Sequence, residues 1–141
     1  MSNSSTSVIP LLGRILLSSV FILSGISKIT AFAMEEGYVI SKHLPMPAVA
    51  LTIALIIELA GGFAILAGLF TKFTAWILFL YMIPTTFLFH NFWAMQGMDR
   101  YDNTVHFQKN LAIMGGLLLL LWRGRVLRRF CPRAEDVALA R

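Results

Sequence analysis

Residues 48–71 read AVALTIALIIELAGGFAILAGLFT, an apolar run in which Glu58 is the one charged side chain. A helix needs about 20 mainly apolar residues to cross the hydrocarbon core of a bilayer, so this run is long enough to span a membrane. Three further runs of this kind occupy residues 10–29, 73–92 and 104–122. Barrel strands are shorter and alternate in polarity. The four runs therefore predict an all-α integral membrane four-helix bundle.

The overall composition also favours a membrane protein. Hydrophobic residues make up 57% of the 141 residues and charged residues 13%, the latter about half the share found in soluble domains. A soluble chain of this length has too much surface for its volume to hide so many apolar side chains. Disordered chains are poor in hydrophobic residues and rich in charge. We expect one membrane domain over residues 1–141, without a separate soluble domain.

The distribution of positive charge predicts the orientation. Six arginines and two acidic residues follow Trp122, so the tail 123–141 carries +4 of the net charge of +5. Cytoplasmic flanks of membrane helices are enriched in Lys and Arg. We therefore expect both termini and the short turn at Lys72 to be cytoplasmic, with loops 31–47 and 91–103 outside. A basic tail directly after an apolar span is typical of contact with anionic lipid, and we expect no nucleic-acid partner.

The first span needs to be distinguished from a signal peptide, because Ala31-Phe32-Ala33 has the form of a cleavage site. Residues 1–13 contain no Lys or Arg, and the apolar run is longer than that of an ordinary signal peptide. We expect the span to be retained. Trp76, Trp93, Trp122, Tyr38 and Tyr101 are expected to be interfacial anchors.

Polar side chains within the spans are the candidate site residues. An ionisable group in hydrocarbon is costly, so it usually faces the bundle interior, a partner or a cavity. With the expected orientation, the outer half of the bundle holds Lys28, Glu58, His90, Asn91, His106, Lys109 and Asn110. Arg14 lies near the inner surface instead, where its long side chain can reach water.

Glu58 is expected to pair with Lys28 or Lys109, and both lysines are expected to point into the bundle, because an unpaired carboxylate in hydrocarbon is unfavourable. Two interpretations of this cluster stay open. The charges fix the register of the helices, or they line an outward-opening cavity that binds a small head group or moves protons.

No sequence motif supplies a cofactor or a metal site of the chain's own. His90 and His106 lie at the outer ends of their spans, but HxxxH, ExxH and cysteine partners are missing from the sequence around them. Cys131 is the single cysteine, which excludes a CxxC redox pair. The chain also lacks a P-loop, a GxGxxG fingerprint and a nucleophile elbow. We expect no metal and no intrinsic cofactor, and catalytic activity of the chain alone stays undecided.

Several short motifs follow one another in a specific order. They are Gly13-Arg14, Phe21, Gly25-xx-Lys28, Pro45-Met46-Pro47, Glu58-xx-Gly61-Gly62, Gly68, Phe89-His90-Asn91-Phe92, Lys109-Asn110-Leu111 and Gly115-Gly116. Together they resemble the DoxX family of small four-helix bacterial membrane proteins, over roughly residues 10–122. The resemblance maps onto Arg14, Lys28, Glu58, His90, Lys109 and Asn110.

The resemblance implies a multi-pass protein of the bacterial inner membrane. The family takes its name from subunits associated with a membrane thiosulfate–quinone oxidoreductase, and other members are implicated in oxidative-stress complexes. It therefore also implies a link to quinone or sulfur redox chemistry, although a shared fold does not establish an activity.

Three hypotheses of function follow. In the first, the chain is a redox-associated subunit whose outer cavity holds a quinone-like head group. Lys28, Lys109, His90 and Asn110 would donate hydrogen bonds to its oxygens, Glu58 would exchange protons, and a partner protein would supply the redox cofactor. In the second, the chain is a non-catalytic scaffold or assembly partner with structural charges. In the third, a homo-oligomer forms a pathway for a small solute or for protons.

Overall fold

The computed structural model describes the backbone of residues 5–130 and the side chains of residues 8–122. The side chains of the basic tail expected over 123–141, and Cys131, lie outside these ranges. Within them the chain is helical, with no strand. Its elements are α1 (Ser5–Thr30), α2 (Phe32–Ser41), α3 (Pro47–Ala67), α4 (Thr71–Phe89), the short 3-10 helix η1 (Phe92–Ala94) and α5 (Gly97–Phe130).

Four of these helices are long and apolar enough to cross a membrane. The qualifying segments are Val8–Thr30, Pro47–Ala67, Thr71–Ala94 and Gly97–Trp122. The predicted all-α architecture with four membrane helices is therefore confirmed. α5 begins at Gly97, before the span expected from residue 104, and its 34 residues extend over roughly 50 Å. It is thus longer than the hydrocarbon core is thick.

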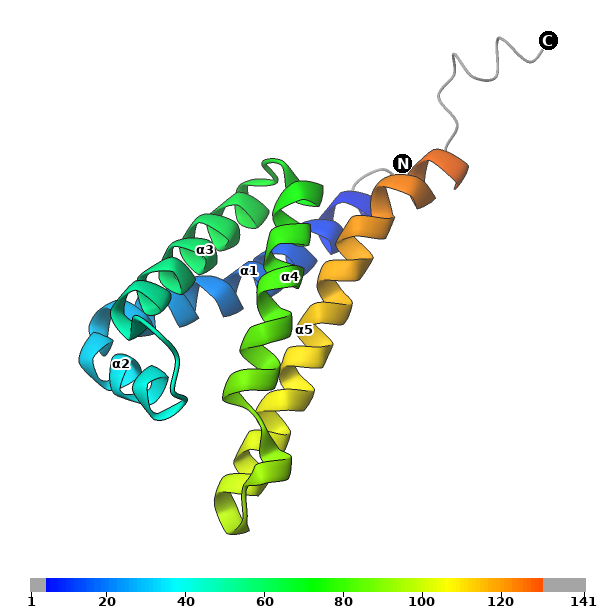
Figure 1. Ribbon diagram of the computed structural model, residues 1–141. Coiled ribbons are helices and arrows are strands. Elements are labelled where there is room, and N and C mark those ends of the chain that lie inside the picture. The colour runs from blue at the N-terminus through cyan, green and yellow to red at the C-terminus, as the bar shows by residue number, and fades with distance from the viewer. Residues whose placement is uncertain (1–4, 131–141) are drawn as a thin grey trace, which may run out of the picture.

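The turn between α3 and α4 is closed by backbone hydrogen bonds. Gly68 adopts the left-handed conformation with φ of 73°, and its N–H donates to the carbonyl of Ile65 at 3.1 Å. The N–H of Leu69 donates to the carbonyl of Ala64 at 2.9 Å. These bonds satisfy carbonyls that a helix end leaves free. Because the turn is short, α3 and α4 run antiparallel from it, and they diverge as they leave it (Figure 1).

The helices pack as two pairs, α1 against α3 and α4 against α5, and α1 touches α5 much less. Glycines allow the first pair to approach closely. A Cβ atom at Gly62 would lie 2.8 Å from Cγ1 of Ile22 and 3.2 Å from its backbone nitrogen. The pairs meet around a buried apolar cluster that includes Phe21, Ile65, Leu78 and Leu117.

The segment expected to be an outer loop, 31–47, contains the helix α2 instead. The N–H of Ala31 still donates to the carbonyl of Ser27, and the carbonyl of Ala31 accepts from Glu35, so α2 follows α1 almost without a break. Its buried residue is Val39. The sequence expectation missed it because ten residues that include two glutamates are too short and too polar for a membrane span. α2 lies at the end of the α1–α3 pair that is far from the α3–α4 turn (Figure 1).

Candidate functional site

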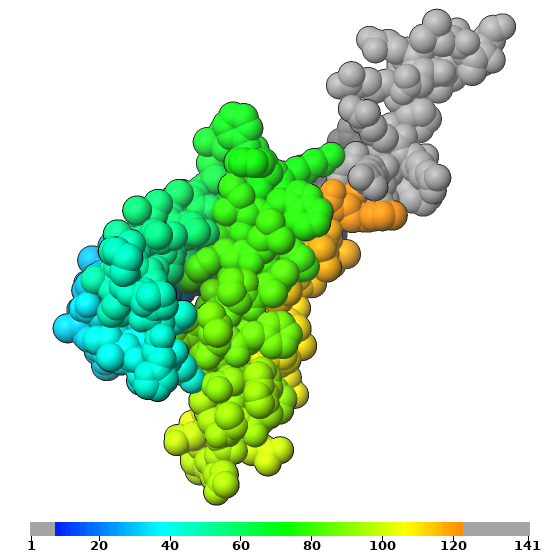
Figure 2. Space-filling model, in the orientation of Figure 1, coloured from blue at the N-terminus to red at the C-terminus, as the bar shows by residue number. Residues whose placement is uncertain are grey.

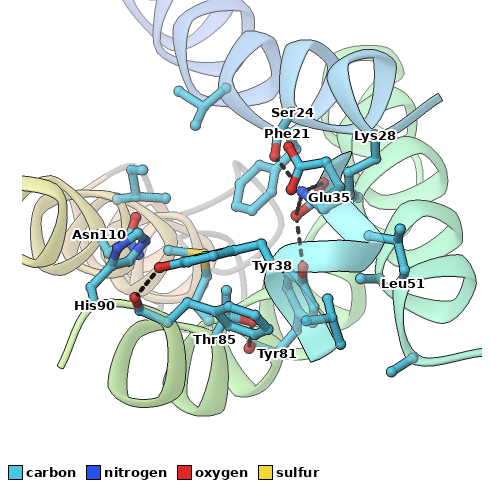
Figure 3. A pocket seen from close by; sticks show the side chains of 18 of the residues that line it. Phe21, Ser24, Lys28, Glu35, Tyr38, Leu51, Tyr81, Thr85, His90 and Asn110 are labelled. Carbon is cyan, nitrogen blue, oxygen red and sulfur yellow. Dashed lines mark hydrogen bonds and ion pairs between the residues drawn. The ribbon is translucent and has the colours of Figure 1, made fainter. Parts of the chain in front are cut away.

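A cavity of about 260 Å³ lies among the α-helices, with lining residues from each of α1 to α5. Of the eight side chains singled out from the sequence, the cavity wall includes Lys28, Glu58, His90 and Asn110. Figure 3 shows Ser24 and Lys28 on one side of the cavity and His90 and Asn110 on the other. The site therefore has two polar ends, which differ in how fully their hydrogen bonds are satisfied.

The first polar end is an ion pair between α1 and α3. Nζ of Lys28 lies 2.9 Å from Oε2 of Glu58 and 3.1 Å from Oε1. The same nitrogen donates to Oγ of Ser24 at 2.8 Å, and the hydroxyl of Tyr81 donates to Oε1 of Glu58 at 2.7 Å. The side chain of Lys28 is 15% exposed and that of Glu58 is 6% exposed. The expectation that a lysine pairs with Glu58 is confirmed, and the partner is Lys28.

Helix geometry explains why this lysine is the partner. Ser24 and Lys28 are four residues apart, so they share one face of α1, and that face is turned towards α3 across the glycine contacts. A buried charge is tolerated when it is paired and its remaining hydrogen-bonding groups are satisfied. The bond that Lys28 donates to Ser24 and the bond that Glu58 accepts from Tyr81 meet that condition.

The second polar end has unsatisfied groups. Nδ1 of His90 lies 3.2 Å from Oδ1 of Asn103, and Nδ2 of Asn103 donates to the carbonyl of Asp99 at 2.9 Å. Oδ1 of Asn103 is therefore an acceptor, and Nδ1 of His90 carries the proton. In the neutral ring Nε2 is then an acceptor, not the donor expected from the sequence. The amide of Asn110 forms no hydrogen bond with the described residues and is the available donor at this end.

Helix α2 closes one side of the cavity. The hydroxyl of Tyr38 donates to the carbonyl of Phe89 at 2.7 Å, and Nζ of Lys42 donates to Oδ1 of Asn91 at 2.9 Å. Asn91 thus binds α2 at the edge of the cavity and does not line it. Burial raises the pKa of Tyr38, and nearby Glu35 raises it further, so its hydroxyl stays protonated at neutral pH. In Figure 2 the cyan surface of α2 meets the green surface of α4 here.

Two of the expected side chains on α5 do not line the cavity. His106 is exposed and stacks on His90, with ring centroids 5.1 Å apart and planes 14° apart. Lys109 is also exposed, so the expectation that it points into the bundle is wrong. Asn110 and Ile113 mark the cavity face of α5, and a residue one position earlier is turned about 100° away from Asn110.

Arg14 lies away from the cavity, at the α3–α4 turn. Its Nη1 is in close contact with Gly68, at the carboxyl end of α3. The negative end of a helix dipole favours a cation. Nε of Arg14 is buried and has no hydrogen-bond partner.

Sequence reasoning missed five polar residues that line the cavity. They are Ser24, Glu35, Tyr38, Tyr81 and Thr85. Tyr38 was assigned to the interface, although it faces the site. A signal for Tyr81 was present, because Tyr81, Thr85 and Phe89 recur at four-residue spacing and so share one face of α4. Among the described residues, no three His, Cys, Asp or Glu side chains converge on a point that could hold a metal ion.

The ion pair gives a prediction for stability. Glu58→Ala leaves the charge of Lys28 buried without a partner, which typically costs about 3–5 kcal/mol. Replacing both residues, Glu58→Gln with Lys28→Met, removes the stranded charge and is expected to recover much of that loss. Thermal unfolding in detergent measures both variants. Exposed Lys109→Met is the control for loss of a lysine, and we expect it to change the midpoint little. A double variant as unstable as Glu58→Ala would contradict this account of the pair.

Two known inner membrane proteins are similar to this chain over most of its length. The chain is 33% identical over 117 residues to "Inner membrane protein YphA" of Escherichia coli (strain K12), which covers 83% of this chain and 84% of the relative. It is 38% identical over 114 residues to "Inner membrane protein YqjF" of the same organism, covering 81% and 82%. No solved structure matches the chain significantly.

The family model described as DoxX matches residues 9–91. This range contains α2, α3 and α4 and most of α1, and it includes the Lys28–Glu58 pair, Tyr81 and His90. The two relatives extend the similarity over most of the chain. The four membrane-spanning helices and these matches together show that the chain is a small inner membrane protein that belongs to the DoxX family.

Proposed function

We propose that this protein is a redox-associated membrane subunit whose cavity binds the head group of a quinone-like molecule. The observation that carries the proposal is the cavity's construction, with apolar walls between two separate polar ends. Phe21, Leu51, Met82 and Ile113 contribute apolar surface. A quinone ring has the same pattern, since it is flat and apolar with an oxygen at each end.

The size of the cavity favours a head group over a whole lipid. Sites for drug-sized ligands usually have volumes of about 300–1,000 Å³, and this cavity has about 260 Å³. A ring can enter it while an isoprenoid tail remains in the surrounding hydrocarbon. At the far end the amide of Asn110 is available as a donor to one ring oxygen. Nε2 of His90 is available as an acceptor for the hydroxyl of the reduced form.

The charge of the cavity favours a neutral ligand. The wall contains the carboxylates of Glu35 and Glu58 and one ammonium group, that of Lys28. The ammonium is already held by Glu58. An incoming sulfur oxyanion would meet an excess of negative charge at low dielectric, which is unfavourable. A redox partner protein would exchange electrons with the quinone.

One observation favours the alternative, a non-catalytic scaffold. The Lys28–Glu58 pair satisfies its hydrogen bonds entirely within the protein, through Ser24 and Tyr81. A structural pair needs nothing more. The free amide of Asn110 and the open volume beside it have no role under this alternative.

Quinone binding distinguishes the two functions. We expect the protein in lipid nanodiscs to bind decylubiquinone. Asn110→Leu is expected to weaken binding roughly 2- to 12-fold, because one hydrogen bond contributes about 0.5–1.5 kcal/mol. Isothermal titration calorimetry measures the dissociation constants of the wild type and of the variant. Gln108→Leu is the matched control, since Gln108 is an exposed amide on the same helix. If the wild type does not bind, or if both variants lose affinity equally, the quinone site is refuted and the scaffold function remains.

We also propose that both termini and the α3–α4 turn are cytoplasmic, which makes α2 and His90 the outer end of the bundle. Arg14 and Lys72 both lie at that turn, and the arginine-rich tail begins in the last turns of α5, at the end of this helix that is far from His90. A membrane-impermeant maleimide should label Asp99→Cys in intact cells. It should reach Lys72→Cys only after permeabilisation. Labelling of Lys72→Cys in intact cells would show that the orientation is the opposite of the proposed one.

A further inference from the structure

Glu35 is a carboxylate of the cavity that the sequence placed in an outer loop. It lies in the first turn of α2, and its partly buried side chain lines the cavity. Figure 3 shows it beside Lys28. Within the described residues it forms neither a salt bridge nor a side-chain hydrogen bond, because the ammonium of Lys28 is bonded to Glu58 and Ser24. The site therefore contains two carboxylates in different situations.

Glu58 is poorly suited to exchange protons. Both of its oxygens accept from Lys28, and Oε1 also accepts from Tyr81. The residue is 5% exposed. A proton added to Glu58 would displace one of these bonds and leave the ammonium of Lys28 buried without a counter-ion, which is strongly unfavourable. Its role is to hold α1, α3 and α4 together.

Glu35 has the opposite properties. It contacts the cavity on one side and is partly exposed on the other. Protonation of Glu35 removes the excess negative charge of the cavity and breaks no ion pair. The ionisable groups that line the cavity with it are Lys28, Tyr38, Glu58, Tyr81 and His90. Four of these are already bonded within the protein, because Lys28 and Tyr81 both bond to Glu58 and Tyr38 bonds to the carbonyl of Phe89. Nδ1 of the fifth, His90, is bonded to Asn103.

We propose that Glu35 is the proton-exchanging residue of this site, passing protons between the outer water and the bound head group. This inference rests on the proposed quinone function. In reduction, the quinone takes two electrons from the redox partner and two protons from the outer water to become the quinol. One proton reaches the nearer ring oxygen through Glu35, and the other reaches the oxygen at the His90 end without Glu35. At the nearer oxygen, the O–H bond of the Glu35 carboxyl breaks, an O–H bond forms on the ring oxygen, and the carboxylate regains a proton from water. Oxidation reverses each step.

The test uses the full-length protein in nanodiscs with bound decylubiquinone. Reduced methyl viologen supplies the electrons, and stopped-flow absorbance follows formation of the quinol. Glu35→Gln keeps the shape of the side chain but cannot exchange a proton. We expect it to bind oxidised quinone within about twofold of the wild type and to form quinol at least about tenfold more slowly. Glu36→Gln is the matched control, because Glu36 is the next residue of α2 and does not line the cavity. It should react like the wild type.

Chemical rescue separates proton transfer from a structural effect. A small weak acid such as formic acid should restore much of the rate in Glu35→Gln and leave the wild type unchanged, and Glu35→Asp should keep most of it. If Glu35→Gln binds quinone and reacts at the wild-type rate, this inference alone is overturned. The same holds if its rate falls without rescue by the acid or by Asp. If the wild type binds no quinone, the proposed function fails and the inference fails with it.

Discussion

A carboxylate buried within an apolar membrane helix needs a counter-charge, and the pairing of Glu58 with Lys28 meets this need. The pair joins α3 to α1, and the hydroxyl of Tyr81 extends the same network to α4. Three of the four membrane helices are therefore fixed relative to one another by one group of hydrogen bonds. Close packing makes this geometry possible, because Gly62 has no side chain to hold α1 away from α3. Loss of one partner would leave the other as an isolated charge at low dielectric.

The position of this network also determines where the cavity lies. α3 and α4 diverge from their turn, and the space between the two helix pairs is bounded on one side by the ion pair and on the other by His90 and Asn110. α2 closes another side through Tyr38 and Lys42, which bond to Phe89 and Asn91. Stability and the proposed ligand binding thus draw on different residues of one site. The ion pair is saturated by the protein, whereas Glu35, His90 and Asn110 retain groups that can interact with a ligand.

Much of the fold could be predicted from the sequence because it depends on properties of continuous stretches of the chain. The length of an apolar run and the cost of a charge within it predicted the four membrane helices and the need for a partner to Glu58. The resemblance to the DoxX family rested on motifs in the same segments. The choice between Lys28 and Lys109 depends on the rotation of α1 and α5 about their axes, which the spacing of a few polar residues does not determine. In the structure α5 is rotated so that Lys109 faces outward.

Helix α2 could not be predicted by the same reasoning, because ten residues with two glutamates resemble a solvent-exposed loop. Two of the missed cavity residues were missed because they lie on this helix, and a third was missed because nothing in its own span marks it. Glu35 and Tyr38 lie on α2, and Tyr81 appears as one aromatic among many in an apolar span. Their roles depend on which helix faces them, and that information is present only in the tertiary structure.

The central claim is that the cavity between the helix pairs, and not another apolar surface, receives a quinone head group. Photoaffinity labelling with an azidoquinone in native membranes, followed by peptide mass spectrometry, tests it most directly. We expect adducts on cavity residues such as Leu51 and Met82. These adducts should disappear when unlabelled quinone is added in excess. An apolar groove between α1 and α5, lined by Leu16 and Leu120, is the natural comparison site. Adducts confined to that groove, or spread over the lipid-facing surface and insensitive to competition, would contradict the account.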